Sequence, residues 1–179
     1  MGIFIVILVI ALILVIWYIS TLNNLNRAIV KIDESKSGID VALTKRYDVL
    51  TKMIDVVKGY AKHEKETLFE VIKLRSNMTI GEMNEENHKM DENLKKLNIV
   101  VENYPELKSS ENYKTLQQSI TDVEEHLQAA RRLYNSNVSY YNQMLVVFPT
   151  SIIANNKGMT KREFFEAEEY KREDVKIDL

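Results

Sequence analysis

The sequence of 179 residues contains no cysteine. Without cysteine the chain forms no disulfide, carries no thiol nucleophile and offers no cysteine for lipid attachment. It also holds only five glycines and two prolines, and β-rich domains ordinarily need more turn residues than that. These absences exclude a disulfide-stapled or cysteine-dependent protein and favour a fold built from long helices.

An excess of charge of one sign is missing as well. The 24 basic and 26 acidic residues are interspersed and give a formal net charge of −2, so there is no basic stripe for nucleic acid and no acidic tail. Because the chain has no basic stripe, we expect no nucleic-acid partner. The sequence also lacks a glycine-rich phosphate loop and a nucleophile elbow.

Charge is absent altogether between Met1 and Asn26, where apolar residues are abundant instead. The unbroken apolar run of residues 3–19 would span roughly 26 Å as a helix, which is near the hydrocarbon thickness of a bilayer. It lacks the basic start and the small-residue cleavage site of a signal peptide. Residues 1–21 are therefore predicted to be a retained transmembrane anchor, with Trp17 and Tyr18 as its membrane-interface residues.

The basic residues near the anchor lie on one side of it only. None precedes the span, whereas Arg27, Lys31 and Lys36 follow it. Because basic residues collect on the cytoplasmic side, we expect a single-pass protein of the cell membrane with its N-terminus outside and its soluble part in the cytoplasm. The lipid bilayer is its first expected partner.

An amphipathic stripe continues directly from the anchor. Steps of three and four residues connect Leu22, Leu25, Ile29, Ile32, Lys36, Ile39, Leu43 and Arg46, as on one face of a packed helix. The spacing then slips by one residue at Leu50 and Ile54 and resumes as far as Val71. Such a slip indicates a bend or a tight turn around residues 48–51, and the absence of Gly and Pro there favours a bend.

Two further helices are predicted beyond a loop. The polar residues 76–87, which include Gly81, predict the loop, and a helix over 88–103 ends before Pro105. The clearest stripe then runs to Pro149 with one four-residue stutter, through Leu116, Ile120, Val123, Leu127, Ala130, Tyr134, Val138, Tyr141, Leu145 and Phe148.

The domain plan follows from these elements. Residues 22–149 are predicted to form a helical bundle domain, and residues 150–179 a loop over 150–158, a short helix over 161–170 and a frayed end. The fold class is therefore all-α, with one transmembrane helix followed by an antiparallel bundle of three to four long helices.

Two short patterns resemble metal-binding motifs, but each lacks residues that its motif requires. His63-Glu64 opens the metalloprotease motif, but Thr67 stands where the second histidine belongs. Glu85 and His88 have the spacing of one carboxylate-histidine pair, whereas di-iron bundles need two such pairs and two more carboxylates. We expect no catalytic residue, no metal and no cofactor.

Several polar residues fall on or beside the apolar stripes: Arg46, Glu64, Arg75, Arg131, Asn135 and Asn142. A buried carboxylate needs a partner, and an arginine is the natural one for Glu64. The predicted role of this polar network is structural, to fix the register of the helices. The competing interpretation is a ligand or partner site between helices.

The order of short motifs resembles that of the LemA family of bacterial membrane proteins. The motifs are an N-terminal anchor and residues 39–48, 57–64, 104–108, 130–135, 141–142, 148–149 and 164–166, with Arg75 between them. The resemblance implies a membrane-anchored helical bundle without established catalytic residues. The family commonly has a proline soon after the Arg-Tyr-Asp run, and Thr51 stands at about that place here.

These observations favour a non-enzymatic, membrane-tethered scaffold or interaction module that recruits unidentified protein partners. The alternative is a sensory or ligand-binding bundle that holds a small molecule between helices near Glu64 and Arg131. That alternative predicts an interior pocket lined by these two residues.

Overall fold

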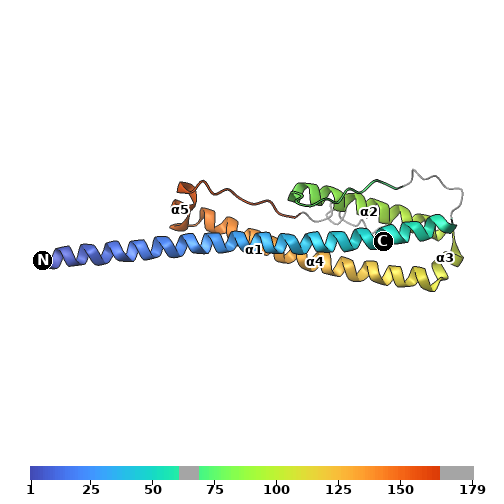
Figure 1. The fold of residues 1–179 in the computed structure, drawn as a ribbon, viewed down its shortest axis with the longest axis horizontal. Coiled ribbons are helices and arrows are strands. Elements are labelled where there is room, and N and C mark those ends of the chain that lie inside the picture. The colour runs from blue at the N-terminus through green and yellow to red at the C-terminus, as the bar shows by residue number, and fades with distance from the viewer. Residues whose placement is uncertain (61–68, 166–179) are drawn as a thin grey trace, which may run out of the picture. The chain divides into compact units, whose positions relative to one another are not determined.

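The computed structural model describes residues 1–60 and 69–165, and it is helical nearly throughout this part of the chain. The elements are α1 (Gly2–Tyr60), α2 (Ile80–Glu102), α3 (Pro105–Ser109), α4 (Glu111–Val146) and α5 (Thr150–Asn156) (Figure 1). No strand occurs in the described ranges. The all-α class and the helical bundle predicted from the sequence are confirmed.

The chain divides into two compact units, and α1 and α4 each contribute to both. One unit contains Met1–Ser37 and Leu133–Phe164, and the other contains Gly38–Arg132 and the segment that begins at Phe165. We call them the anchor unit and the bundle unit. Each is described below by itself.

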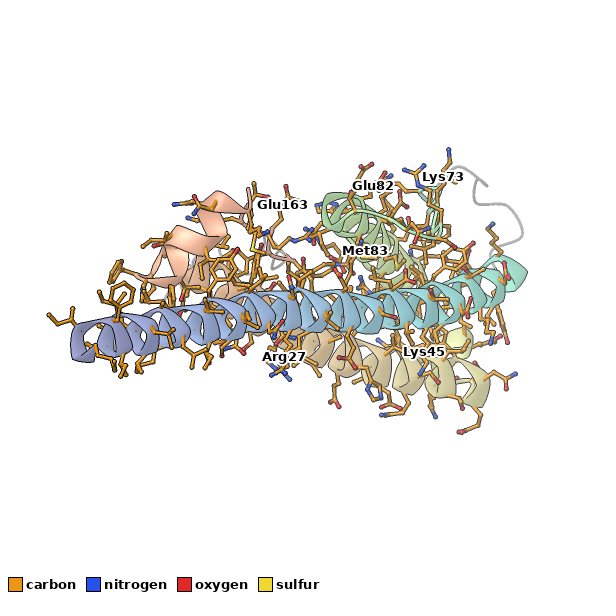
Figure 2. The ribbon with its side chains drawn as sticks, turned by 60° about the vertical axis from the view of Figure 1, so that its left-hand side comes forward. Arg27, Lys45, Lys73, Glu82, Met83 and Glu163 are labelled. Carbon is orange, nitrogen blue, oxygen red and sulfur yellow. The ribbon has the colours of Figure 1, made fainter. Side chains whose placement is uncertain are left out.

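The helix α1 is continuous over 59 residues, so the predicted run from the anchor straight into the domain is confirmed. Its first part is exposed on every side, and buried positions begin at Thr21. From there a seam runs in steps of three and four residues, apart from the adjacent pair Ala42 and Leu43. Its residues are Leu25, Ala28, Ile32, Ser35, Ile39, Ala42, Leu43, Arg46, Leu50, Met53 and Val57. The opposite side of the helix is polar, and Arg27 and Lys45 point outward from it (Figure 2).

Of the two interpretations of residues 48–51, a bend or a tight turn, the tight turn does not occur, because the helix passes through these residues unbroken. The seam takes up its extra residue earlier, where Ala42 and Leu43 are both buried, and Met53 rather than Ile54 continues it. Likewise Ser35 occupies the seam in place of Lys36, and Ala28 in place of Ile29. Small side chains let the helices approach closely. Because they are small or polar, they do not stand out in a pattern of large apolar residues.

The predicted loop over 76–87 is wrong from residue 80 onward, because α2 begins at Ile80. Thr79 caps this helix: its hydroxyl accepts the N–H of Glu82, and the Glu82 carboxylate accepts the N–H of Thr79 at 2.7 Å. This reciprocal capping box satisfies backbone donors that a helix start otherwise leaves unpaired. Gly81 lies inside the first turn, where one glycine is tolerated.

The expected helical stripe as far as Val71 is also incorrect over its last residues. Residues 69–79 are not helical in the structure; they are extended apart from a turn at residues 76–77, and residues 61–68 lie outside the described ranges. The extended segment runs back along α2, since Glu70 pairs with Asn93, and Lys73 pairs with Glu86 nearer the start of that helix. Consequently α2 runs in the same direction as α1, and α4 runs opposite to both (Figure 1).

The core of the bundle unit lies among α1, α2, α3 and the start of α4. Its buried side chains are Leu50, Met53, Val57, Met90, Leu97, Val100, Val101, Leu107, Tyr113 and Ile120. Each large apolar side chain contributes about 1.5–3 kcal/mol when it is fully buried. Since helix propensity alone contributes little, this packing provides most of the stability of the helices.

The end of the described chain departs from expectation in two places. Residues 150–156 form α5 instead of a loop, and Ile153 and Ala154 are the buried residues of this helix. The described part of the predicted helix over 161–170, residues 161–165, is not helical, and the rest lies outside the described ranges. The helix breaks before Pro105 and Pro149 are as predicted, because α2 ends at Glu102 and α4 at Val146.

Candidate functional site

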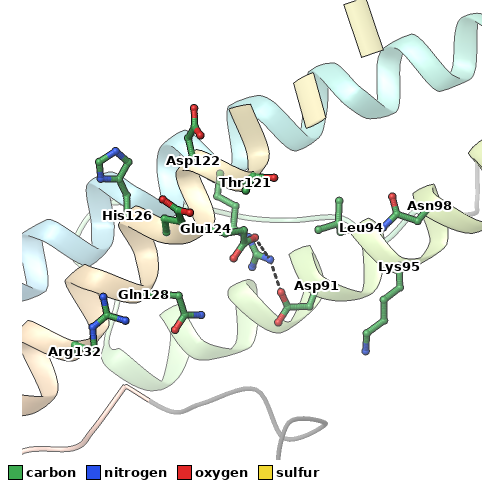
Figure 3. A pocket seen from close by; sticks show the side chains of 12 residues that line it. Asp91, Leu94, Lys95, Asn98, Thr121, Asp122, Glu124, His126, Gln128 and Arg132 are labelled. Atoms are coloured by element: carbon green, nitrogen blue, oxygen red, sulfur yellow. Dashed lines mark hydrogen bonds and ion pairs between the residues drawn. The ribbon is translucent and has the colours of Figure 1, made fainter. Parts of the chain in front are cut away.

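The most concentrated polar chemistry of the bundle unit surrounds Arg46 of α1, whose side chain is only 2% exposed. Its Nε donates to Glu124 Oε1 of α4 at 2.6 Å, and its Nη2 pairs with Asp91 of α2 (Figure 3). Its Nη1 donates to the side-chain oxygen of Asn87 at 2.6 Å and to the Asn87 carbonyl oxygen at 3.2 Å. Arg46 therefore ties three helices together.

The local sequence explains how these groups converge. Arg46 occupies a seam position of α1, and Asn87 and Asp91 lie one turn apart on the face that α2 turns toward the core. All three guanidinium nitrogens have an acceptor, and Nη2 also lies 2.6 Å from Glu124 Oε1. A buried charge with every donor engaged fits a structural tie better than a group waiting for a ligand.

An open cleft of about 1040 Å³ lies beside this tie, between α2 and α4. The residues that line it, all polar or charged except Leu94, carry charges of both signs (Figure 3). They are Arg46, Asp91, Leu94, Lys95, Asn98, Thr121, Asp122, Glu124, Glu125, His126, Gln128 and Arg132. Among residues 1–60 and 69–165, no three His, Asp or Glu side chains are grouped as a metal site requires.

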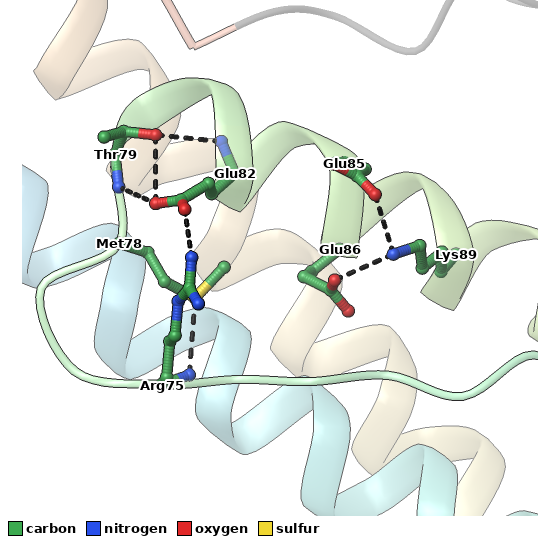
Figure 4. A network of polar contacts seen from close by, with 7 residues as sticks. All are labelled: Arg75, Met78, Thr79, Glu82, Glu85, Glu86 and Lys89. Atoms are coloured by element: carbon green, nitrogen blue, oxygen red, sulfur yellow. Dashed lines mark hydrogen bonds and ion pairs between the residues drawn. The ribbon is translucent and has the colours of Figure 1, made fainter.

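A second polar network holds the extended segment to the start of α2 (Figure 4). Arg75 pairs with Glu82 of the capping box, and both side chains are exposed to solvent. Glu86 accepts the backbone N–H of Lys73 at 2.7 Å and the ammonium group of Lys89 at 2.9 Å. Lys89 also donates to Glu85 at 2.8 Å.

These contacts change the acidity of Glu86. Burial raises the pKa of its carboxyl group, but the hydrogen bonds from Lys89 and from the Lys73 backbone outweigh burial and hold the pKa below 4.5. The carboxylate form is therefore the one that fastens the extended segment to α2.

Two asparagines fasten extended chain to a helix in the same way. Asn93 is fully buried; it accepts the N–H of Glu70 at 2.7 Å and donates to the carbonyl of the same residue at 2.9 Å. In the anchor unit, Asn142 makes the equivalent pair with Arg162, at 2.9 Å in both directions. The amide side chain pairs with a peptide unit as a neighbouring strand would.

The residues predicted to form one polar network are dispersed. Arg46 pairs with Asp91 and Glu124, Arg75 with Glu82, and Arg131 with Gln128 at 2.5 Å. Asn142 holds residue 162, Asn135 is half-buried on α4, and Glu64 lies outside the described residues. Of the interface residues, Trp17 is half-buried and Tyr18 is exposed.

Sequence reasoning missed Asn87, Asp91, Asn93 and Glu124. Asn87 carries a local signal, because it lies three residues before the apolar Met90. A helix predicted to begin at residue 88 leaves Asn87 in the loop. Glu124 follows Val123 on α4, and nothing local distinguishes it from the exposed Glu125.

These features define a helical-bundle protein whose first helix is a candidate membrane span: α1 has a stretch of mean hydropathy 3.2 with none of it buried. The model of the LemA family matches residues 35–179, and the chain belongs to the LemA family. The match begins after the apolar stretch, so membership rests on the part of the chain that holds the bundle.

Individual relatives agree with this assignment. Protein LemA of Metamycoplasma hominis is 30% identical over 163 residues, which is 88% of this chain and 74% of that protein. Magnetosome protein MamQ of Magnetospirillum gryphiswaldense is 29% identical over 72 residues, or 40% of this chain and 26% of that protein. Magnetosome protein MamQ 2 of Paramagnetospirillum magneticum is 32% identical over 73 residues, or 41% and 27%.

We expect Arg46→Leu to destabilise the bundle by about 3–5 kcal/mol, because it removes the buried cation that both Asp91 and Glu124 contact. Adding Asp91→Asn and Glu124→Gln should recover part of that loss. Urea denaturation of the detergent-purified protein, followed by circular dichroism, measures both effects. As a matched control, Arg75→Leu removes an arginine that is 69% exposed and should cost less than about 1 kcal/mol. Equal losses for the two arginines would contradict the role given to Arg46.

The acidity of Glu86 predicts a pH dependence. A carboxyl group whose folded pKa is lowered contributes stability above its unfolded pKa of about 4.5, and this stability is lost as the pH falls through the folded value. Glu86→Gln keeps an oxygen acceptor for the Lys73 N–H but removes the charge. Its melting temperature should therefore fall less steeply below about pH 4.5 than that of the parent protein. Superimposable melting profiles across the acid range would refute this account.

Proposed function

We propose that this LemA-family chain is a membrane-anchored, non-enzymatic interaction module whose helical bundle organises protein partners beside the bilayer. The observation that carries the proposal is the change of environment along α1. Large apolar side chains from Ile3 to Ile16 are exposed, whereas from Leu25 onward the apolar side chains of the seam are buried. An exposed apolar rod of this length is stable in a lipid bilayer and not in water.

The polar interior supports the non-enzymatic part of the proposal. The buried guanidinium of Arg46 donates its hydrogen bonds to Asn87, Asp91 and Glu124. It therefore has no donor left with which to bind a substrate. Recognition by surfaces of long helices is a common role for folds of this kind.

The alternative, a bundle that senses a small molecule, has less support. It expects a pocket lined by Glu64 and Arg131, and Arg131 is not part of the wall of the cleft beside Arg46. A ligand in that cleft would meet a wall whose central cation already has acceptors from three residues. We therefore assign the Arg46 network to the architecture of the bundle.

The proposed orientation has the bundle in the cytoplasm. Its support is the set of basic residues Arg27, Lys31 and Lys36 that follows the apolar stretch. Fusions of a fluorescent protein and of alkaline phosphatase to the C-terminus test it in bacterial cells. We expect the fluorescent fusion to be active and the phosphatase fusion to be inactive. The reverse pattern would overturn the orientation while leaving the anchor in place.

Site-specific photo-crosslinking tests the interaction module. A photoreactive residue at Ile99 of α2 or at Val41 of α1, both exposed in the bundle unit, should give discrete adducts with other proteins in intact cells. The same residue at the fully buried Leu97 is the matched control and should give none. If neither exposed position gives an adduct, and deletion of the gene leaves every membrane assembly unchanged, the proposal fails.

A further inference from the structure

The turn that joins α4 to α5 carries an apolar surface that the fold leaves uncovered. Val146, Val147, Phe148 and Ile152 are exposed by 62, 55, 77 and 50%. Their neighbours Leu145, Ile153 and Ala154 are buried, so the inner side of the turn is already packed. Outward-facing apolar groups gathered on a well-packed element are typical of a binding surface. We call residues 146–152 the apolar turn.

The place of the apolar turn within the anchor unit suggests what it contacts. Residues 2–20 of α1 have no buried position, and burial begins at Thr21. Figure 1 shows α5 and the end of α4 beside α1 where this exposed stretch ends, and the view in Figure 2 agrees. The 19 residues of the stretch span about 28 Å, close to one hydrocarbon core. The apolar turn therefore lies near the level at which α1 leaves the bilayer.

The charges of the anchor unit point to the same surface. No Asp or Glu occurs before Asp33, and none occurs between residues 126 and 162. The basic residues in these two stretches of the unit are Arg27, Lys31, Lys157, Lys161 and Arg162. The acidic residues of the unit, Asp33, Glu34 and Glu163, lie outside these two stretches. An exposed apolar surface accompanied by an excess of basic residues is complementary to anionic lipid headgroups.

We propose that the apolar turn inserts into the interface of the same bilayer that holds α1, so that the anchor unit has a second membrane contact. Phe148 and Val147 lie among the acyl chains just below the headgroups, and the basic residues of the unit lie at the headgroup level. This contact restrains the anchor unit against the membrane surface, which a single helix crossing the bilayer does not do. The inference rests on the membrane anchoring in the proposed function.

Fluorescence quenching by lipid tests this inference on the full-length protein. The parent chain has one tryptophan, Trp17, which reports on the anchor. The double variant Trp17→Phe/Phe148→Trp moves the indole to the apolar turn, and Trp17→Phe/Tyr60→Trp moves it to an exposed position at the far end of α1. Each protein is reconstituted into vesicles of phosphatidylcholine with phosphatidylglycerol, in which the phosphatidylcholine carries bromine near the headgroup end of its chains.

We expect the indole introduced by Phe148→Trp to lose about half its fluorescence relative to unbrominated vesicles and to emit at a shorter wavelength. The indole introduced by Tyr60→Trp should be unaffected. Quenching of Trp17 in the parent, without quenching in the Phe148→Trp variant, would overturn this inference alone. Absence of quenching at Trp17 would remove the anchor and with it the proposed function.

A different occupant of the apolar turn has its own signature. If a second copy of the chain covers the turn, the Phe148→Trp indole stays unquenched, and its emission shifts to shorter wavelength as the protein-to-lipid ratio rises. That result would overturn membrane insertion of the turn. The charge reversals Lys157→Glu and Lys161→Glu, added to the Phe148→Trp variant, should weaken its quenching in anionic vesicles. Unchanged quenching would refute the headgroup contact.

Discussion

The rest of the structure depends on one helix, α1, whose two parts suit different environments. The first part is suited to a lipid bilayer, and the second is suited to packing against other helices. Up to residue 20 its surface is apolar on all sides, whereas beyond Thr21 the apolar residues are concentrated in one seam and the other faces are mostly polar. The apolar first part needs a bilayer, because water does not tolerate so much exposed hydrocarbon. The seam needs other helices, and α2 and α4 supply its cover in the bundle unit. Membrane attachment and bundle formation are thus properties of a single element.

Polar contacts decide how the bundle is assembled. Arg46 interrupts the apolar seam, and its burial is tolerated only because α2 and α4 bring acceptors to each guanidinium nitrogen. Asn93 and Glu86 similarly hold the extended segment 69–79 on α2. Hydrophobic packing is non-directional and so does not by itself select one alignment of the helices. These hydrogen bonds and ion pairs are directional, and they form only when the helices are in the observed register. The most polar part of the interior therefore contributes to the specificity of the fold.

Patterns with a short period were readable from the sequence. The stripe of α4, with its stutter between Tyr134 and Val138, appears as predicted as far as Leu145. Phe148, the last residue of the predicted stripe, is instead 77% exposed, because α4 ends at Val146. The ends of α2 and α4 before Pro105 and Pro149 also appear as predicted. The errors arose where a pattern depends on small or polar residues. Ala28 and Ser35 occupy seam positions assigned to larger neighbours, and Thr79 with Glu82 begins a helix in a stretch whose composition indicates a loop. A capping box is a local signal, so that error was avoidable.

The sequence alone determined the apolar N-terminal helix, the helical class and the spacing of the seams. These features depend only on residues that lie within one or two helical turns of one another. Only the tertiary structure decided the direction of α2, the partners of Arg46 and the position of the apolar turn beside the start of the seam. Asp91 and Glu124 lie 45 and 78 residues from Arg46, and many carboxylates at such separations look equivalent in a sequence. Which of them meets the arginine depends on how whole helices pack, and that is a property of the folded chain.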